Sequence, residues 1–264
     1  MPRAKRRLGQ HFLTDPRILG RIADALEAGP GDTVLEIGPG PGGLTDALAT
    51  RAGRLVAIEK DPDMVPALRA RFPAAEIVEG DALELDWHAL AGPRVLVTGN
   101  IPYNITSPLL DKALQPPRPA RIVFLVQKEV ADRIAAAPGG SEYGALTVGV
   151  RAVAQARRLF TVPAGAFQPR PKVDSAVLRL TPLEHPLVTD ERRVSFRRLV
   201  VGLFGFRRKQ LQRGLRELTG WESDRVLAVL GQVGLDPVGR PETVAPAGYA
   251  GLLTALVDGG WTAG

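Results

Sequence analysis

The chain of 264 residues is long enough for one large domain, or for one domain with a small one attached. Hydrophobic residues make up 45% of it, which favours a sizeable core, and the absence of cysteine excludes a disulfide framework, a thiolate metal site and a cysteine nucleophile. A net charge of +6 and an isoelectric point of about 10.0 favour a polyanion such as nucleic acid as partner, although a general bias towards Arg would give the same total.

Metal and membrane sites are not expected from the residue pattern. His11, His88 and His185 lie far apart in the sequence and form no local ligand pair. No apolar run approaches the length of a membrane span, and the N-terminus lacks the apolar core of a signal peptide. We therefore expect a soluble, cytoplasmic protein that acts as a monomer.

The chain starts with a basic arm and a helix. Residues 2–7 carry four basic side chains, which suit a phosphate backbone but are also common in solvated tails. After the segment Gly9–Leu13, Thr14 or Asp15 is a good N-cap, and Pro16 suits the first turn of a helix that ends near Gly29.

A strand, a glycine loop and a helix follow in the order that opens a nucleotide-binding unit. The strand covers residues 33–37, the loop residues 38–43, and the helix opens at Leu44. The loop satisfies both G-x-G-x-x-G, typical of dinucleotide sites, and E-x-G-x-G-x-G, typical of class I methyltransferases that bind S-adenosylmethionine. Glycine lets the backbone pass close to a ligand, whereas the two prolines of the loop remove amide donors that a pyrophosphate would use.

Two acidic residues end the next two predicted strands. Glu59 closes the strand 55–59 and stands about 20 residues past the loop, where a ribose diol is usually bound. Asp81 follows the next strand and could bind an adenine amine, although Asp is also favoured as a helix cap. An ordinary surface acid is the alternative interpretation of Glu59.

The segment Gly99–Asn104 follows the predicted strand 94–98, at the end of a strand where α/β proteins bind ligands. Asn100 offers one acceptor oxygen and two donor hydrogens, and Tyr103 offers a flat face for a base. Pro102 fixes one backbone angle. Such a group suits an exocyclic amine that must be oriented rather than deprotonated; the alternative is an ordinary strand-to-helix turn.

The rest of the chain completes the sheet and then turns helical. Further strands are predicted at 121–127, 156–160 and 176–180. Phe167 opens a proline-rich segment and is either a second stacking face or a hydrophobic plug. From Pro182 onward the pattern is helical, so we predict domains at residues 1–182 and 183–264. The arginine-rich stretch 190–218 favours an RNA-binding helical hairpin, with a solvated face as the alternative.

Together, these motifs resemble the ribosomal RNA adenine N6-dimethyltransferases of the KsgA/RsmA family over essentially the whole chain. The segments N-I-P-Y-N (100–104) and F-x-P-x-P-K-V-D-S (167–175) are the specific parts, while the glycine loop is shared with many methyltransferases. The resemblance implies an α/β Rossmann-like methyltransferase sheet with a small helical C-terminal domain, and S-adenosylmethionine as cofactor. It implies dimethylation of two adjacent adenosines in the 3′-terminal hairpin loop of 16S rRNA, in a 30S assembly intermediate.

The resemblance also implies roles for single residues. His11, Leu13 and Gly38 would border the cofactor, Glu59 would bind its ribose and Asp81 its adenine amine, and Asn100 would lie between cofactor and target. The Asn100 oxygen and a carbonyl of Ile101 or Pro102 would accept the hydrogens of the target amine, and Tyr103 and Phe167 would clamp the base. His11 stands where many members have Asn, and Ile101 where many have Leu.

Three other functions stay open. A 23S rRNA adenine methyltransferase of the antibiotic-resistance type shares the central motif N-I-P-Y-N. The reaction chemistry therefore does not distinguish such an enzyme from one that acts on 16S rRNA. An NAD-dependent oxidoreductase could use the same glycine loop, but nothing after Gly43 supplies a hydride-handling site. A ribosome-assembly factor could bind the same RNA, with methylation as a secondary activity.

Overall fold

The computed structural model describes residue 5 and residues 8–262. Two compact units can be distinguished: the first contains Met1–Ala131 and Ala156–Pro182, and the second Asp132–Gln155 and Leu183–Gly264. The second unit thus takes in residues 132–155, which the sequence analysis assigned to the first domain. The division into domains at residue 182 stays a prediction. The basic arm lies outside the described residues, except for Lys5.

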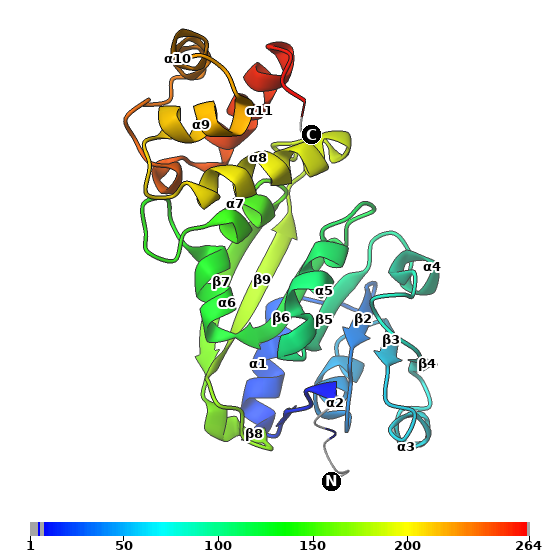
Figure 1. The fold of residues 1–264 in the computed structure, drawn as a ribbon. Coiled ribbons are helices and arrows are strands. Elements are labelled where there is room, and N and C mark those ends of the chain that lie inside the picture. Colours follow the sequence, from blue (N-terminus) through cyan, green and yellow to red (C-terminus); the bar gives the residue numbers. More distant parts are fainter. Residues whose placement is uncertain (1–4, 6–7, 263–264) are drawn as a thin grey trace. The chain divides into compact units, whose positions relative to one another are not determined.

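The first unit is built on a seven-stranded sheet with the strand order β4-β3-β2-β5-β6-β9-β7 (Figure 1). Strands β2 to β6 run parallel, whereas β9 is antiparallel to β6. The carboxyl ends of the parallel strands therefore meet at one edge. The strands are β2 (Thr33–Ile37), β3 (Arg54–Glu59), β4 (Glu76–Glu79), β5 (Leu96–Asn100), β6 (Arg121–Gln127), β7 (Ala154–Val162) and β9 (Ser175–Pro182).

A second, very small sheet joins two segments that are far apart in the sequence. Strand β1 (Phe12–Leu13) pairs antiparallel with β8 (Phe167–Gln168), so that Phe12 lies opposite Gln168 and Leu13 opposite Phe167. This pairing was not predicted. It places the segment after Gly9 beside the proline-rich segment 167–175.

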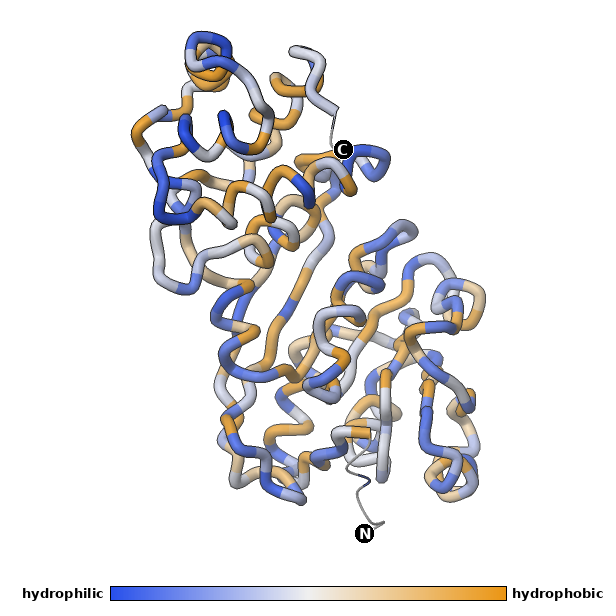
Figure 2. Tube along the Cα trace, in the orientation of Figure 1, coloured by the Kyte–Doolittle hydropathy of each residue, from blue (hydrophilic) through white to orange (hydrophobic). Residues whose placement is uncertain are grey.

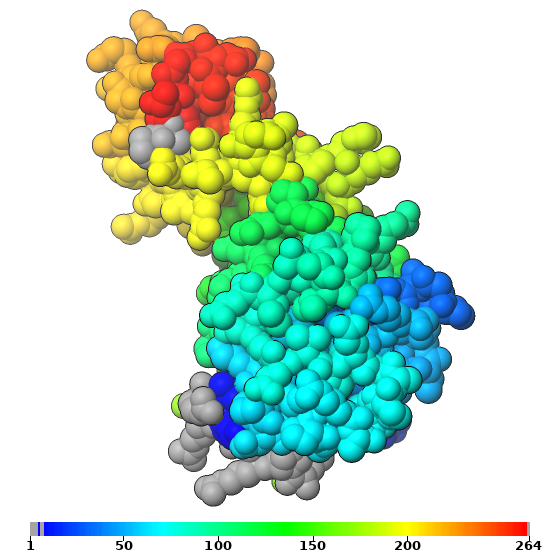
Figure 3. All heavy atoms as spheres, turned by 90° about the vertical axis from the view of Figure 1, so that its right-hand side faces the viewer, coloured from blue at the N-terminus to red at the C-terminus, as the bar shows by residue number. Residues whose placement is uncertain are grey.

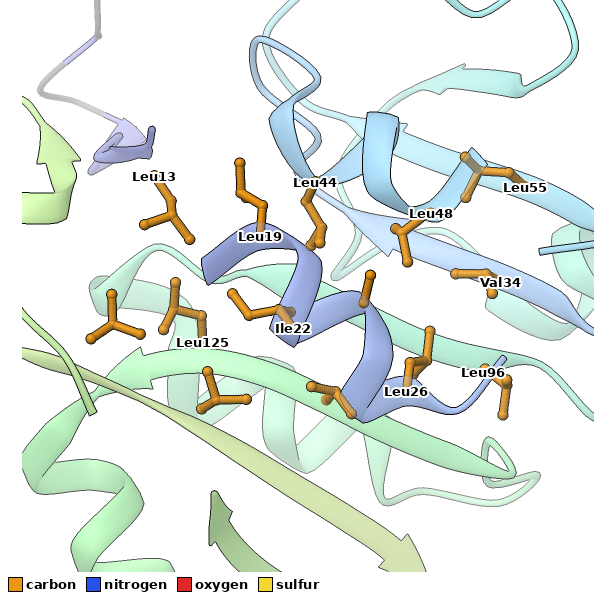
Figure 4. Close-up of a cluster of buried hydrophobic side chains, with 14 of the residues drawn as sticks. Leu13, Leu19, Ile22, Leu26, Val34, Leu44, Leu48, Leu55, Leu96 and Leu125 are labelled. Atoms are coloured by element: carbon orange, nitrogen blue, oxygen red, sulfur yellow. The ribbon is translucent and has the colours of Figure 1, made fainter. Parts of the chain in front are cut away.

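Helix α1 (Pro16–Leu26) shows how the core is formed. Asp15 caps it by accepting hydrogen bonds from the amides of Arg17 and Ile18, as predicted for this cap. Its apolar side chains lie among those of β2, α2 and β5, as Figure 4 shows. The other helices of this unit are α2 (Gly43–Ala49), α3 (Val65–Arg71), α4 (Trp87–Ala91) and α5 (Thr106–Ala113); α6 (Lys128–Ala135) begins in it. The side that carries α3 and α4 faces the viewer in Figure 3.

The second unit is mainly helical, as predicted for the C-terminal part. Its helices are α7 (Ala145–Arg151), α8 (Arg193–Gly205), α9 (Leu211–Thr219), α10 (Ser223–Gln232) and α11 (Pro246–Asp258), and polar and apolar stretches alternate along them (Figure 2). Tyr143 and Tyr249 are fully buried and both pack against Phe204, with ring centroids 6.1 and 6.0 Å from its ring. None of the helices in the described part of the chain could span a membrane.

Candidate active site

A cavity opens at the edge of the sheet where β2, β3 and β5 end. Its wall contains all the predicted site residues except Leu13 and Phe167, namely His11, Gly38, Glu59, Asp81, Asn100, Ile101, Pro102 and Tyr103. Predicted site residues that are up to 92 positions apart in the sequence (His11 to Tyr103) thus share one cavity. Parallel strands with their ends at a common edge account for this convergence.

The glycine loop forms one wall of the cavity. Gly38 and Gly40 have φ angles of +68° and +54°, which L-residues with side chains rarely adopt. A Cβ atom at Gly38 would meet no atom within 4 Å, so this position borders open space, whereas one at Gly40 would lie 3.0 Å from the ring of Phe12. The loop can therefore lie close to a ligand at Gly38 while it packs tightly at Gly40.

Glu59, at the end of β3, is a buried acceptor in the cavity wall, with only 4% of its surface exposed. One carboxylate oxygen accepts a hydrogen bond from the Gly40 amide at 2.9 Å, and the other from the Asp61 amide at 2.8 Å. Burial raises the pKa of this carboxyl, and these two hydrogen bonds oppose the rise. Each oxygen retains acceptor capacity, which suits a pair of hydroxyl groups.

Asp81 lies in the turn after β4, on the same side of the cavity. Its carboxylate accepts a hydrogen bond from the Leu83 amide at 2.9 Å and forms an ion pair with Lys60. Burial alone would raise the pKa of Asp81, but the Lys60 ammonium and the Leu83 amide outweigh it and lower this pKa below its usual range. Asp81 is therefore a charged acceptor. The alternative interpretation, a helix cap, is wrong, because the next helix, α4, is capped by Asp86.

Asn100 is the last residue of β5, and its side-chain amide is held by main chain. Its Nδ2 atom donates a hydrogen bond of 2.7 Å to the carbonyl oxygen of His11. This contact fixes which end of the amide is nitrogen, because a carbonyl can only accept. The Oδ1 atom has no hydrogen-bond donor among the described residues, so it is available to a ligand in the cavity.

Two backbone carbonyls next to Asn100 differ in availability. The Pro102 carbonyl already accepts hydrogen bonds from the Ile105 amide at 3.1 Å and from the Thr106 hydroxyl at 3.3 Å, where α5 begins. The Ile101 carbonyl accepts no backbone amide within the described chain. Of the two carbonyls in the sequence-based prediction, that of Ile101 is thus the available acceptor.

Tyr103 is fixed by two segments that the sequence places far away. Its hydroxyl lies 2.7 Å from the Ser175 hydroxyl, in the last residue of the predicted proline-rich segment. Its ring stacks against His11, with the centroids 5.8 Å apart, and His11 Nδ1 lies 2.7 Å from the carbonyl oxygen of Pro169. Burial raises the pKa of Tyr103. The segment 167–175 therefore contributes to the site mainly by holding Tyr103 and His11.

Leu13 and Phe167 do not reach the cavity. They pair across β1 and β8, are 7% and 5% exposed, and belong to the apolar cluster that also contains Leu19 and Leu125. Figure 4 labels Leu13, Leu19 and Leu125 of this cluster. Opposite residues in a strand pair point to the same face, so both side chains enter the core together. Of the two interpretations of Phe167, the structure therefore favours the hydrophobic plug, because the ring is buried in the core and is not available to stack on a base.

Some residues of the wall were not predicted as site residues. Ile37, Ile58 and Ala82 contribute apolar surface next to Gly38, Glu59 and Asp81. They are chain neighbours of residues that were predicted, and that adjacency is the signal that could have found them. Gln10 and Lys60 also line the cavity, and the same signal applies to them, because they are chain neighbours of His11 and Glu59.

Known proteins resemble this chain over nearly its whole length. The family model described as "Ribosomal RNA adenine dimethylase" matches residues 1–235. Ribosomal RNA small subunit methyltransferase A from Geobacter metallireducens is 43% identical over 264 residues, covering 97% of this chain and 96% of that protein. The protein of that name from Phenylobacterium zucineum is 44% identical over 257 residues, covering 96% and 88%.

Two solved structures share the whole fold. A dimethyladenosine transferase from Plasmodium falciparum is 28% identical with a TM-score of 0.84, over 95% of this chain and 99% of that one. The 23S rRNA methyltransferase ErmE is 30% identical with a TM-score of 0.73, over 93% and 99%. Both lie close enough in structure to share the arrangement of the sheet described above.

Proposed function

We propose that this chain, which belongs to the ribosomal RNA adenine dimethylase family, dimethylates the N6 amines of two adjacent adenosines in the 3′-terminal hairpin loop of 16S rRNA. It is an rRNA adenine dimethyltransferase that uses S-adenosylmethionine. The choice of these two adenosines, and of a 30S assembly intermediate as the form of the substrate, is our inference.

The acidic side of the cavity fits the cofactor. Glu59 offers two buried acceptor oxygens to a ribose diol, and Asp81 offers a charged acceptor to an adenine amine. Gly38 leaves open space beside them. S-adenosylmethionine supplies an electrophilic methyl group when bound, so the remaining task of the protein is to present the target nitrogen.

Asn100 and Ile101 present that nitrogen. The amine of adenine is a poor nucleophile because its lone pair is delocalised into the ring. If Asn100 Oδ1 and the Ile101 carbonyl accept its two hydrogens, the lone pair turns out of the ring plane. Tyr103 provides the stacking face that holds the base in this pose. Orientation of this kind accounts for a large part of many enzymatic rates.

One observation carries the proposal: the bond from Asn100 Nδ2 to the His11 carbonyl leaves the amide oxygen as the group available in the cavity. An amide turned the other way would present donors to an amine that itself needs acceptors.

The test is mass spectrometry of rRNA after undermethylated 30S particles and, in a parallel reaction, free 23S rRNA are incubated with the protein and a labelled methyl donor. We expect two dimethylated adenosines in the hairpin near the 3′ end of 16S rRNA, and far less dimethylation at the same time point with the Asn100→Ala variant. Label in 23S rRNA adenines instead would support the antibiotic-resistance type of enzyme, which the likeness to ErmE keeps as the second candidate.

Location and oligomeric state are part of the same proposal. We infer a cytoplasmic enzyme because its substrate, small-subunit rRNA, is assembled into ribosomes there, and we expect it to act as a monomer. Sedimentation of the protein alone and with 30S particles tests the second point: one copy of the chain should co-sediment with each particle.

A further inference from the structure

The orientation of Asn100 depends on where the carbonyl of His11 lies. After His11 the chain is fixed by the pairing of Phe12 with Gln168 in the small sheet. Before His11 it is fixed through Gln10, whose side-chain Nε2 donates to Asp61 at 3.2 Å. The carbonyl that accepts from Asn100 is thus held from both sides.

Asp61, which accepts the hydrogen bond from Gln10, has a buried and well-fixed side chain. Its side chain is 0% exposed, and it pairs with the Lys5 ammonium at 2.5 Å. Burial by itself raises the pKa of Asp61, but the hydrogen bonds from Lys5 and Gln10 outweigh this and lower it. A buried carboxylate that is paired in this way stays charged and stays in place.

The other end of the Gln10 amide is used as well. Its Oε1 atom accepts a hydrogen bond from the backbone amide of Lys5 at 2.7 Å. Asp61 in turn donates its own amide to Glu59 at 2.8 Å. One hydrogen-bonded path therefore leads from Glu59 through Asp61 and Gln10 to the main chain at His11, and from there to Asn100.

We propose that Gln10 and Asp61 form a latch that positions Asn100 for methyl transfer. Both are positioning residues: they act on the reaction through the His11 carbonyl and Asn100. Without the Gln10 side chain the segment before His11 loses this attachment, so the carbonyl that accepts from Asn100 is held from one side only and orients the amide less firmly. The inference rests on the proposed role of Asn100, and displacements of about 1 Å in such sites can cost about 100-fold in rate.

A double-mutant cycle tests whether the latch acts through Asn100. At saturating S-adenosylmethionine and 30S particles, Gln10→Ala should lower the single-turnover rate at least about tenfold, while the Kd values for both ligands change less than about threefold. In the Asn100→Ala background the same change should cost nothing further. Gln10→Glu, which has the same shape but is repelled by Asp61, should behave like Gln10→Ala. Gln232→Ala, an exposed glutamine on α10, is the matched control.

A loss of the same size in both backgrounds, or no loss in the wild-type background, would overturn the latch. A second measurement is independent of turnover. NMR of the protein alone gives the rate at which the Asn100 Nδ2 hydrogens exchange with water, with Asn100→Ala used for assignment. Gln10→Ala should speed this exchange at least about fivefold, and Gln232→Ala should not. An unchanged exchange rate contradicts the proposal.

The two tests also separate the latch from the proposed function. If the wild-type protein methylates no rRNA adenine, the proposed function fails, yet the exchange measurement still decides whether Gln10 holds Asn100. If methylation occurs as proposed and the exchange rate does not respond to Gln10→Ala, the latch alone is wrong.

Discussion

At the scale of single residues, the chemistry of this site depends on which atom of Asn100 faces the cavity. Asn100→Ala removes the proposed acceptor for the target amine, an interaction that matters most when the nitrogen becomes pyramidal. It should therefore lower the single-turnover rate at least about 100-fold and leave rRNA affinity nearly unchanged. Asn100→Asp keeps an acceptor but adds a negative charge, so partial activity with a new pH dependence is expected. An equal loss of rate and affinity in Asn100→Ala would contradict the orienting role.

Tyr103 combines a stacking face with a hydroxyl that contacts Ser175. Tyr103→Phe keeps the ring and loses one hydrogen bond, so it should cost about 1 kcal/mol of stability and little activity. Tyr103→Ala should lower kcat/KM by an amount equivalent to roughly 1–3 kcal/mol, the cost of losing a stacked base. Thermal melting of each variant separates the two effects. If the Tyr103→Ala variant melts normally and methylates at the wild-type rate, Tyr103 does not stack on the target base and is only a packing residue.

Glu36, in β2, gives the protein a pH-dependent stability that does not involve catalysis. Burial raises its pKa to about 8, and the Thr45 hydroxyl donates to it at 2.7 Å. The folded state therefore holds a proton that the unfolded state releases near pH 4.5. The stability due to this group is complete below pH 4.5 and is lost as the pH rises through 8.

Glu36→Gln removes this dependence, because a neutral amide still accepts from Thr45. Between pH 5 and pH 9, the free energy of unfolding of the variant relative to the wild type should rise by more than about 1.4 kcal/mol, the value of one pKa unit. Urea unfolding at both pH values measures it. A difference between variant and wild type that is the same at both ends of this range would mean that Glu36 does not titrate as a buried group.

Sequence reasoning identified the residues of the cavity wall where a motif fixes both residue type and backbone position. Glu59 and Asn100 end strands, Gly38 and Asp81 lie just after strands, and strand ends converge. It could not decide between the Ile101 and Pro102 carbonyls, since that depends on how the first turn of α5 uses its donors. Nor could it place Phe167, because an aromatic residue at the head of a loop suits a core and a binding face equally well.

At the scale of elements, α9 and the turn before it offer the surface most suited to RNA. Arg208, Arg213 and Arg216 are exposed and have no ion-pair partner in the part of the chain that the structure describes. Arg207, in contrast, pairs with Glu242 and donates to the carbonyl of Ser141 at 2.9 Å. Within the same arginine-rich stretch, we therefore expect one set of side chains to bind RNA and another to stabilise the fold.

Substitution of Arg208, Arg213 and Arg216 together by Gln should weaken rRNA binding and flatten its dependence on salt, since each lost phosphate contact reduces the slope. Arg207→Gln is the matched control: it should lower the melting temperature and leave the salt slope unchanged. Filter binding over a range of salt concentrations measures the slope. If the salt dependence of rRNA binding is the same in the triple variant and the wild type, these three arginines form an ordinary solvated surface that does not bind RNA.

The small sheet of β1 and β8 shows where prediction from local pattern ends. Each strand has only two residues, too few for an alternating pattern to be recognised. The partners are separated by more than 150 positions, so no local signal connects them. Yet this pairing fixes the chain next to His11, and through it the amide of Asn100.

At the scale of the whole molecule, the Rossmann-like methyltransferase fold, the family and the rRNA adenine dimethyltransferase activity predicted from the sequence are confirmed. Parallel strands rich in β-branched residues and helices with an N-cap residue can be recognised from the local sequence. The extent of the two compact units cannot be recognised in this way, because residues 132–155 interrupt the first unit and join the second. The contacts that decide this come from residues about 100 positions later in the chain.

Those contacts predict what happens when the C-terminal helices are removed. In the second unit the Tyr143 hydroxyl donates to the Val244 carbonyl at 2.8 Å, and the Gly139 amide to the Glu242 carbonyl at the same distance. Helix α7 packs against α8. A chain truncated after Pro182 would therefore expose the buried side of α7 and leave these groups without partners.

We expect this truncated chain to lose hydrogen-exchange protection at the amides of Val148 and Ala152, while those of β5 and β6 stay protected. A truncated chain in which residues 132–155 are replaced by a short Gly/Ser linker is the control, and it should aggregate less because the exposed apolar surface is gone. Hydrogen exchange with mass spectrometry and light scattering measure both effects. If the chain cut after Pro182 protects α7 as the full chain does, residues 132–155 belong with the first unit, and the domain division at residue 182 is the correct one.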